Sequence, residues 1–233
     1  MVVQEALILG IKTLNEIDIP NPALDSQLIL SFVLGKDRLA LFTDRQAKLS
    51  KEQQTQYSKL LALRCKHMPI AYITGQKEFY GLKFYVNPEV LVPRPETEFA
   101  VEEVLRFIAS LETSRVADIC CGSGAIGVSI AVNNKNAKVY ASDISEACGQ
   151  VTIKNAKIHD VDDRIFFIQG DLLVPFEKMG IGNFDVIVSN PPYIPSKEIK
   201  LLPEDVKQEP KLALDGGLCG LEMYRRIILL APK

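Results

Sequence analysis

The chain has 233 residues, of which 47% are hydrophobic and 24% charged, with a formal net charge of -2 and a pI near 5.8. These are ordinary values for a globular protein, and they allow one large domain or a large and a small one. The near-neutral charge gives no general attraction to nucleic acid or anionic membranes, and no apolar run approaches the length of about 18 residues that a membrane span needs. Met1 is not followed by a signal-peptide pattern, so we expect a soluble, cytoplasmic protein.

The cysteines and histidines do not have the spacing of metal ligands. The number of cysteines is odd and no Cys-x-x-Cys pair occurs, so neither a disulfide framework nor a zinc site is expected. The sequence therefore predicts reduced thiols packed in the core, and it predicts no metal site. The cysteines are Cys65, Cys120, Cys121, Cys148 and Cys219, and the histidines are His67 and His159.

The first seventy residues carry the signals of three helices. Asn21 is a suitable N-cap, Pro22 suits a first helical position, and Gly35 suits the end of the second helix. Ser50 and Gln53 form a capping-box pattern at the start of the third. Each helix has apolar residues at helical spacing, namely Ala6, Leu7, Ile11 and Leu14; Leu24, Leu28 and Phe32; and Tyr57, Leu60 and Leu61. We therefore predict a helical bundle over residues 1–72.

A short β-hairpin is expected to link the bundle to the rest of the chain. Two aromatic segments surround Gly81 in residues 78–86, which is typical of a hairpin, and we place the linker at residues 73–93. The prolines and carboxylates of residues 92–98 then indicate a helix start.

From about residue 114 the pattern alternates between strand and helix. Candidate strands are residues 115–119, 138–142, 165–169 and 184–189, and the segments between them are long enough for crossover helices. We therefore predict an α/β fold with a mostly parallel, doubly wound sheet over residues 94–233. A polar residue marks the end of each strand, and these should meet at one ligand-binding edge: Asp118, Asp143, Asp171 and Asn190.

The segment after the first of these strands suggests a nucleoside site. Its glycines, Gly122, Gly124 and Gly127, let the backbone approach a ligand, and Asp143 follows at the distance that suits a ribose. The same glycines match the dinucleotide fingerprint, which leaves a nicotinamide or flavin enzyme as an alternative. Against this alternative, the Asp118 carboxylate suits an ammonium group better than a pyrophosphate.

Asn190-Pro191-Pro192-Tyr193 follows the last predicted strand. Two prolines forbid a helix and stiffen the exit from the strand, so an amide side chain, bare carbonyls and an aromatic ring are held at the strand's end. Such a site can accept both hydrogens of a planar NH2 group. The tetrapeptide indicates an enzyme that acts on an amide or amine nitrogen.

With these motifs the chain resembles the Rossmann-like class I S-adenosylmethionine-dependent methyltransferases, whose first motif is acid-x-Gly-x-Gly-x-Gly. Residues 118–124 fit this motif, except that Cys120 replaces the first glycine. The resemblance implies S-adenosylmethionine as cofactor, with Asp143 on the ribose and Asp171-Leu172 beside the adenine. It also places further cofactor contacts at Asp118, Cys120, Cys121, Gly122, Ser123, Gly124 and Asn190.

Within this class, nearly the whole chain resembles the protein-(glutamine-N5) methyltransferases that modify peptide chain release factors. The likeness rests on the helical N-terminal region, Asn190–Tyr193, and the segments 79–81, 93–98 and 209–217. It implies N5-methylation of a glutamine amide, with the Asn190 side-chain oxygen and the Pro191 carbonyl accepting the two N–H hydrogens.

The same resemblance implies that Pro192 and Tyr193 contact the substrate, with the Tyr193 ring on the amide plane. Arg94 is expected near the cofactor and the substrate entrance. The helical bundle would recognise the release factor.

Three alternative functions stay open at this point. An adenine N6-methyltransferase on DNA or RNA would also have to accept the two hydrogens of a planar NH2 group, although the net charge of the chain counts against this function. A glutamine methyltransferase on a ribosomal protein and a non-catalytic S-adenosylmethionine-binding module are the others. The resemblance also implies further strands after the predicted helix at residues 221–230, so we expect the protein to continue for about fifty residues.

Overall fold

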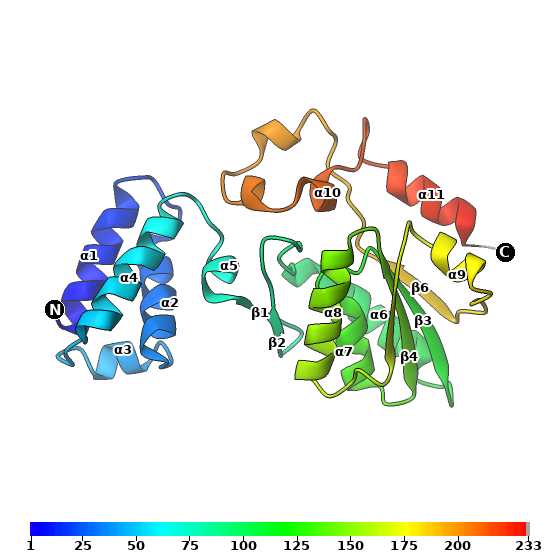
Figure 1. Cartoon of the computed structure of the whole chain (residues 1–233), viewed down its shortest axis with the longest axis horizontal. Coiled ribbons are helices and arrows are strands. Elements are labelled where there is room, and N and C mark those ends of the chain that lie inside the picture. Colours follow the sequence, from blue (N-terminus) through cyan, green and yellow to red (C-terminus); the bar gives the residue numbers. More distant parts are fainter. Residues whose placement is uncertain (232–233) are drawn as a thin grey trace. The chain divides into compact units, whose positions relative to one another are not determined.

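The computed structural model describes residues 1–231, and the chain divides into two compact units (Figure 1). Unit 1 consists of residues 1–75 together with the short segment 204–208. Unit 2 consists of residues 76–203 and the chain from residue 209 onward. The residues that form unit 1 therefore come from two separate parts of the sequence.

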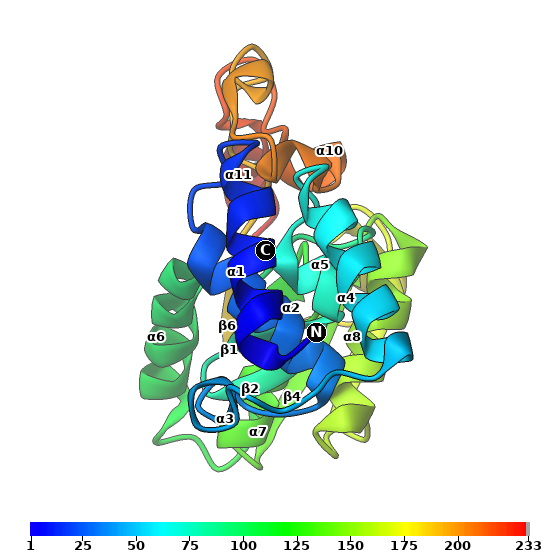
Figure 2. The same cartoon turned by 90° about the vertical axis from the view of Figure 1, so that its left-hand side faces the viewer.

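Unit 1 is helical, as the sequence predicts (Figure 2). Its elements are α1 (Val3–Asn15), α2 (Pro22–Leu34), α3 (Ala40–Thr43), α4 (Lys51–Arg64), α5 (Ile70–Thr74) and the 3-10 turn η3 (Val206–Gln208). The capping box of α4 is confirmed, because the Ser50 hydroxyl accepts from the Gln53 N–H at 3.2 Å and the Gln53 amide accepts from the Ser50 N–H at 2.9 Å. Gly35 ends α2 in the left-handed conformation, with φ of 62°.

The buried face of α2 differs from the prediction. Leu24 and Phe32, two of the residues expected to form the apolar face, are 39% exposed. The helix instead buries a face that includes two polar residues, Asp25 and Ser26. The same face buries the apolar residues Ile29 and Leu30, and the Ser26 hydroxyl forms a hydrogen bond with the Tyr57 hydroxyl of α4 at 2.7 Å.

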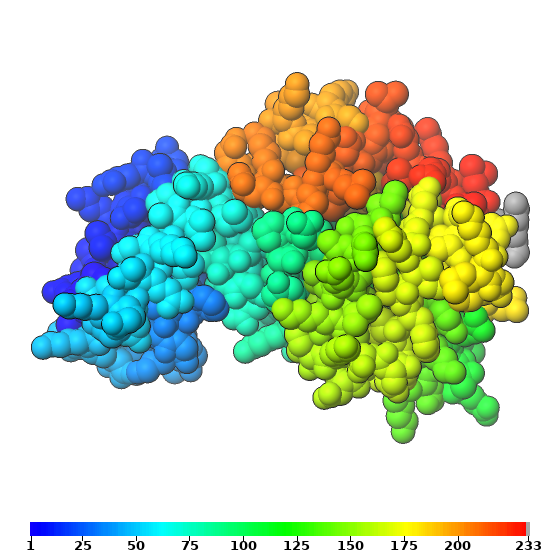
Figure 3. Space-filling model, viewed as in Figure 1, coloured from blue at the N-terminus to red at the C-terminus, as the bar shows by residue number. Residues whose placement is uncertain are grey.

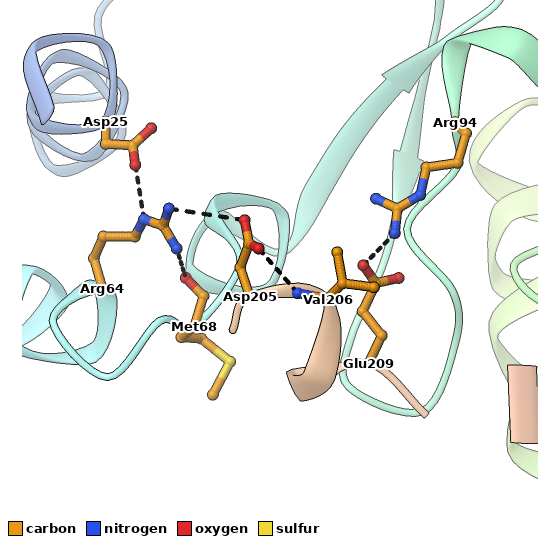
Figure 4. Close-up of polar contacts among 7 residues, drawn as sticks. All are labelled: Asp25, Arg64, Met68, Arg94, Asp205, Val206 and Glu209. Carbon is orange, nitrogen blue, oxygen red and sulfur yellow. Dashed lines mark hydrogen bonds and ion pairs between the residues drawn. The ribbon is translucent and has the colours of Figure 1, made fainter. Parts of the chain in front are cut away.

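Arg64 makes the principal buried ion pair of unit 1 (Figure 4). Its Nε donates to Asp25 at 2.7 Å, and the two side chains are only 6% and 9% exposed. A second guanidinium nitrogen donates to the Met68 carbonyl at 3.1 Å, and a third lies 4.0 Å from the Asp205 carboxylate. Arg64 thus ties α2 and α4 to the segment 204–208.

Unit 2 begins with the predicted hairpin, formed by β1 (Gln76–Phe79) and β2 (Leu82–Tyr85) in antiparallel pairing. The helix start expected near residues 92–98 is confirmed by the 3-10 turn η1 (Pro95–Thr97), which leads into α6 (Glu98–Ile108). The Glu98 carboxylate accepts from the Tyr80 N–H at 2.9 Å and so connects this helix to the hairpin.

The four predicted strands form one fully parallel sheet. They are β3 (Ser114–Ile119), β4 (Ala137–Asp143), β5 (Ile165–Gln169) and β6 (Val186–Ser189), in the order β5-β4-β3-β6. The chain moves outward from β3 through β4 to β5 and then returns to the other side of β3 for β6. The strand order therefore reverses at β3, which is where open α/β sheets bind their ligands.

Helices cover both faces of this sheet. Successive strand residues point to opposite sides, so each strand supplies residues to both layers of helices. Val116, Val139 and Val188 pack with α6, α7 (Ala125–Asn133) and α8 (Glu146–Ile158) on one face. Residues Ala117 and Ile119 pack on the other face with α9 (Val174–Lys178) and α11 (Glu222–Leu230). This arrangement confirms the doubly wound, Rossmann-like fold class.

The chain after β6 folds back beside the sheet. It contains the 3-10 turn η2 (Ile199–Leu201) and α10 (Lys211–Leu214) before α11. Ile194 pairs with Asp215, and the Ile194 N–H donates to the Leu214 carbonyl at 3.0 Å. In Figure 3 the red atoms at the end of this segment lie beside the yellow atoms, in agreement with the packing of α11 in the same cluster as α9. None of the helices within residues 1–231 is long and apolar enough to cross a membrane.

Candidate active site

A cavity of about 420 Å³ opens at the carboxyl edge of the sheet, within unit 2. Its size falls in the range typical of small-molecule sites, about 300–1,000 Å³. The lining brings together most of the site residues that the sequence predicts, namely Arg94, Cys120, Cys121, Gly122, Ser123, Asp143, Asp171, Leu172, Asn190 and Pro192.

Four residues of the predicted site do not line the cavity. Asp118 is fully buried beneath the loop, and Gly124 lies behind the lining. Pro191 is buried, and Tyr193 is 53% exposed on the far side of the tetrapeptide. The stacking of Tyr193 on a substrate amide stays a prediction.

The loop between β3 and α7 takes an unusual backbone path. Cys120, Gly122 and Gly124 all have positive φ, of 58°, 55° and 76°. Such a conformation is ordinary for glycine and strained for cysteine, which explains why the resembling class has glycine at position 120. The Cys120 side chain faces the cavity without closing it.

Asp143 is held firmly at the end of β4. One carboxylate oxygen accepts from the Gly122 N–H at 3.0 Å, and the other accepts from the Ser145 N–H at 3.0 Å. Both bonds come from the backbone, so the carboxylate is oriented before any ligand binds. Its position in the lining fits an acceptor for a hydroxyl pair.

Three thiols line the same cavity. Burial raises the pKa of Cys120 and of Cys148 to about 12, and it raises the pKa of Cys121 well above its usual value. The thiols are therefore protonated at neutral pH and are poor nucleophiles. They serve packing and shape rather than covalent chemistry.

Asp118 is 0% exposed, and only one of its oxygens has a partner. Oδ2 accepts from the Gly127 N–H at 2.9 Å, whereas Oδ1 has no hydrogen-bond partner. Burial raises the pKa of this carboxyl to about 7.

This raised pKa predicts a pH dependence of stability. The folded chain keeps on Asp118 a proton that the unfolded chain releases above pH 3.8. The contribution of this carboxyl to the free energy of unfolding is therefore complete below pH 3.8 and is lost as the pH rises through about 7. We expect Asp118→Asn, which keeps an acceptor for Gly127, to remove most of the part of this loss that falls between pH 5 and pH 8, about 3 kcal/mol. Urea unfolding at pH 5 and pH 8 measures it. Asp162→Asn, at an exposed position, is the matched control, and equal pH slopes for all three proteins would contradict the expectation.

Asn190 is oriented by a residue of η1. Its Nδ2 donates to the Thr97 hydroxyl at 3.3 Å. Since the oxygen of an amide lies on the opposite prong from the nitrogen, this bond leaves Oδ1 as an acceptor for another group. Both residues line the cavity. Thr97 was not predicted as a site residue, although it lies in the segment 93–98 that carries the family resemblance.

Arg94 is held by a buried glutamate that the sequence analysis did not assign (Figure 4). The Glu209 side chain is 2% exposed, and its carboxylate forms an ion pair with Arg94. The same carboxylate accepts from the Val92 N–H at 3.0 Å. Glu209 thereby holds Arg94 at one wall of the cavity. The sequence could have indicated Glu209, because it lies in the segment 209–217 that carries the family resemblance.

Asp171 forms an ion pair with Arg226 of α11. Arg226 and Met223 line the cavity from this helix. Their contribution could not be found from the sequence, because nothing in the local pattern of residues 222–230 points to a ligand.

The tetrapeptide backbone is packed against glycines of the segment after α10. A Cβ added to Gly216 would lie 2.6 Å from the Tyr193 Cα and 2.7 Å from the Pro192 carbonyl oxygen. Gly220 approaches the Tyr193 carbonyl in the same way. Only glycine fits at these distances, which accounts for the glycines near the end of the chain.

We therefore expect Gly216→Ala to displace the tetrapeptide and to lower the rate of the reaction at this site at least about tenfold, because a misplacement of about 1 Å at a reacting group can cost 10²-fold. The turnover rate and the melting temperature of the purified variant measure the effect. Gly182→Ala, which meets nothing within 4 Å, is the control. Equal activity of the two variants would show that the tetrapeptide tolerates the shift.

The cavity's donors and acceptors fit S-adenosylmethionine. Asp143 can accept from the hydroxyl groups of a ribose, and the glycine-containing loop beside it lines the same cavity. Among residues 1–231 no group of three or more histidine, cysteine, aspartate or glutamate side chains could hold a metal ion.

Comparison with known proteins identifies the class of protein. Residues 5–75 match the family described as PrmC N-terminal domain, and residues 97–212 match the family described as Methyltransferase small domain. The catalytic domain of hMettl16, solved in complex with MAT2A 3′UTR hairpin 1, has a similar fold, with a TM-score of 0.54, 18% identity, and coverage of 80% of this chain and 64% of that chain. The fold and the site define a Rossmann-like methyltransferase with S-adenosylmethionine as its cofactor.

Relatives with sequence similarity over the whole chain narrow the class. The release factor glutamine methyltransferase of Clostridium acetobutylicum is 44% identical over 100% of this chain and 82% of its own length. That of Clostridium botulinum is 40% identical over 98% of this chain and 81% of its own length. The chain belongs to the release factor glutamine methyltransferase family.

Proposed function

We propose that the protein transfers a methyl group from S-adenosylmethionine to the N5 nitrogen of a glutamine side chain in a peptide chain release factor. The observation that carries this proposal is the orientation of Asn190, whose Nδ2 is bound to Thr97 while Oδ1 remains an acceptor at the cavity wall. Family membership supports the same substrate. The cytoplasm, where release factors act, is the proposed compartment.

The difficulty of the reaction lies in the amide nitrogen, whose lone pair is delocalised into the carbonyl. S-adenosylmethionine supplies an electrophilic methyl group when it is bound. In the proposed arrangement, Asn190 Oδ1 and the Pro191 carbonyl accept the two N–H hydrogens and favour the positive charge that develops on the nitrogen. Holding the nitrogen in a near-attack position can contribute roughly 7–11 kcal/mol.

The rest of the proposed site positions the cofactor. Cys120–Gly124 form the loop beside its amino-acid part, Asp143 binds the ribose, and Asp171-Leu172 lie beside the adenine. The rigid backbone bonds of Asp143 and the ion pair of Asp171 support these roles. Arg94 is proposed to lie near the cofactor and the substrate entrance, and its ion pair with Glu209 at the cavity wall supports a fixed position.

The test is intact-mass spectrometry of an unmethylated release factor after incubation with the protein and S-adenosylmethionine. The expected result is a gain of one methyl group that peptide mapping assigns to a single glutamine. No gain, with cofactor binding intact, would overturn the substrate and direct the assay to ribosomal proteins and nucleic acids. The partner that we propose is the release factor, a protein rather than a nucleic acid.

A further inference from the structure

Helix α8 presents a buried polar stripe to the loop between β3 and α7. Cys148, Thr152 and Asn155 follow one another at spacings of four and three residues, so they share one face of the helix. Thr152 is 1% exposed and Asn155 is 0% exposed. Polar side chains at such positions are costly unless they are fully hydrogen-bonded, so their partners indicate their role.

Both side chains bind the backbone of the loop. The Thr152 hydroxyl donates to the Gly122 carbonyl at 3.2 Å, and it lies 3.5 Å from the Cys121 sulfur. The Asn155 Nδ2 donates to the Ser123 carbonyl at 2.8 Å. Two consecutive carbonyls of the loop are therefore held from one helix.

Asn155 also anchors the hairpin. Its Nδ2 donates to the Tyr85 carbonyl at 2.9 Å, and its Oδ1 accepts from the Tyr85 N–H at 2.7 Å. The side chain thus uses both of its N–H donors and its acceptor in this network. A side chain whose donors and acceptor are all hydrogen-bonded can hold the loop in one conformation.

The loop needs this support because its backbone path is unusual. Three of its residues have positive φ, and a Cβ added to Gly124 would lie only 2.8 Å from the Thr152 methyl group. Because the two sides of a trans peptide point in opposite directions, a Gly122 carbonyl held by Thr152 turns the Ser123 N–H away from α8. The two bonds to α8 therefore determine which backbone groups the loop presents to a ligand.

We propose that Thr152 and Asn155 are positioning residues for cofactor binding, which hold the loop 121–124 in its binding conformation before the cofactor arrives. The inference rests on the proposed function in that it places the cofactor against this loop. Neither residue lines the cavity, so both act through the loop backbone. Without them the free loop would relax, and binding would have to restore its conformation, which weakens the apparent affinity.

The test compares Thr152→Val with Thr152→Ser. Valine keeps the shape and removes the hydroxyl, whereas serine keeps the hydroxyl and removes the methyl group. We expect Thr152→Val to raise the dissociation constant for S-adenosylhomocysteine about tenfold, and Thr152→Ser to rescue binding to within about twofold of the wild type. Isothermal titration calorimetry below the melting temperature of each variant measures this.

A purely structural role predicts a different result. In that case Thr152→Val lowers the melting temperature but leaves the dissociation constant unchanged, and this outcome would overturn the proposal. A weaker affinity in Thr152→Ser with normal affinity in Thr152→Val would also overturn it, since packing would then be the cause. Hydrogen exchange at the Gly124 amide, which donates to the Cys121 carbonyl at 2.7 Å, gives a second readout and should accelerate in Thr152→Val alone.

Asp143→Asn separates this proposal from the placement of the cofactor. If Asp143→Asn weakens binding and Thr152→Val does not, the cofactor lies on the loop and only the role of α8 is wrong. If neither change affects binding, the cofactor lies elsewhere and the proposed site fails. The assay needs no protein substrate, so it does not depend on the identity of the methylated protein.

Discussion

Asn190→Ala is expected to lower kcat about 10²–10³-fold, the loss seen when one preorganised hydrogen-bonding group that stabilises a transition state is removed. The side-chain oxygen of Asn190 is the acceptor that favours charge on the substrate nitrogen, and alanine offers none. Single-turnover methylation of a release factor, followed by mass spectrometry, measures the rate. Binding of S-adenosylhomocysteine to the same variant, by calorimetry, shows whether the cavity is preserved.

Asn136→Ala is the matched control for this change. Asn136 is exposed and directly precedes β4, at the opposite end of that strand from Asp143. The control should retain the wild-type rate. If Asn190→Ala also retained it, amide activation by this side chain would be excluded and another acceptor would have to be sought.

The second large effect is expected on stability. Arg64→Ala leaves the Asp25 carboxylate buried without its cation, which typically costs about 3–5 kcal/mol. We expect a loss of that size in the free energy of unfolding, measured on the whole chain by urea denaturation. The double variant Asp25→Leu/Arg64→Met should recover much of it, since an apolar pair of similar volume removes the unpaired charge.

Arg106→Ala is the control for Arg64→Ala. Arg106 pairs with Glu103 on α6, and both side chains are mostly exposed, at 73% and 66%. Such a surface pair contributes about 0–1 kcal/mol. Equal effects of the two arginine substitutions would show that burial does not strengthen the Arg64 pair.

Much of the sheet could be predicted from the sequence because its strands are short segments that alternate with stretches long enough for crossover helices. All four were expected, with bounds that differ from those of the structure by two residues at most, and three of the four polar residues at their ends, Asp143, Asp171 and Asn190, line one cavity. The glycine loop and the Asn-Pro-Pro-Tyr segment were found for the same reason: each depends on backbone properties that a few residue types dictate.

The parts that were missed depend on contacts between distant residues. The face of α2 was wrong because Asp25 and Ser26 find partners in α4, which no spacing within α2 reveals. The short helices α3 and α5 lack a long apolar period. Arg226 and Glu209 come from segments far along the chain, so only the folded structure shows that they form ion pairs with Asp171 and Arg94.

The five-residue segment 204–208 has a practical consequence for dissecting the molecule. A fragment made by cutting after Gly75 would contain every long helix of unit 1 and would still lack the Asp205 carboxylate that lies 4.0 Å from Arg64. The complementary fragment would carry that carboxylate on a stretch of chain deprived of its packing surface. Expression boundaries taken from the linear sequence are therefore expected to separate Arg64 from Asp205. A graft of residues 204–208 onto the N-terminal fragment would supply the Asp205 carboxylate again.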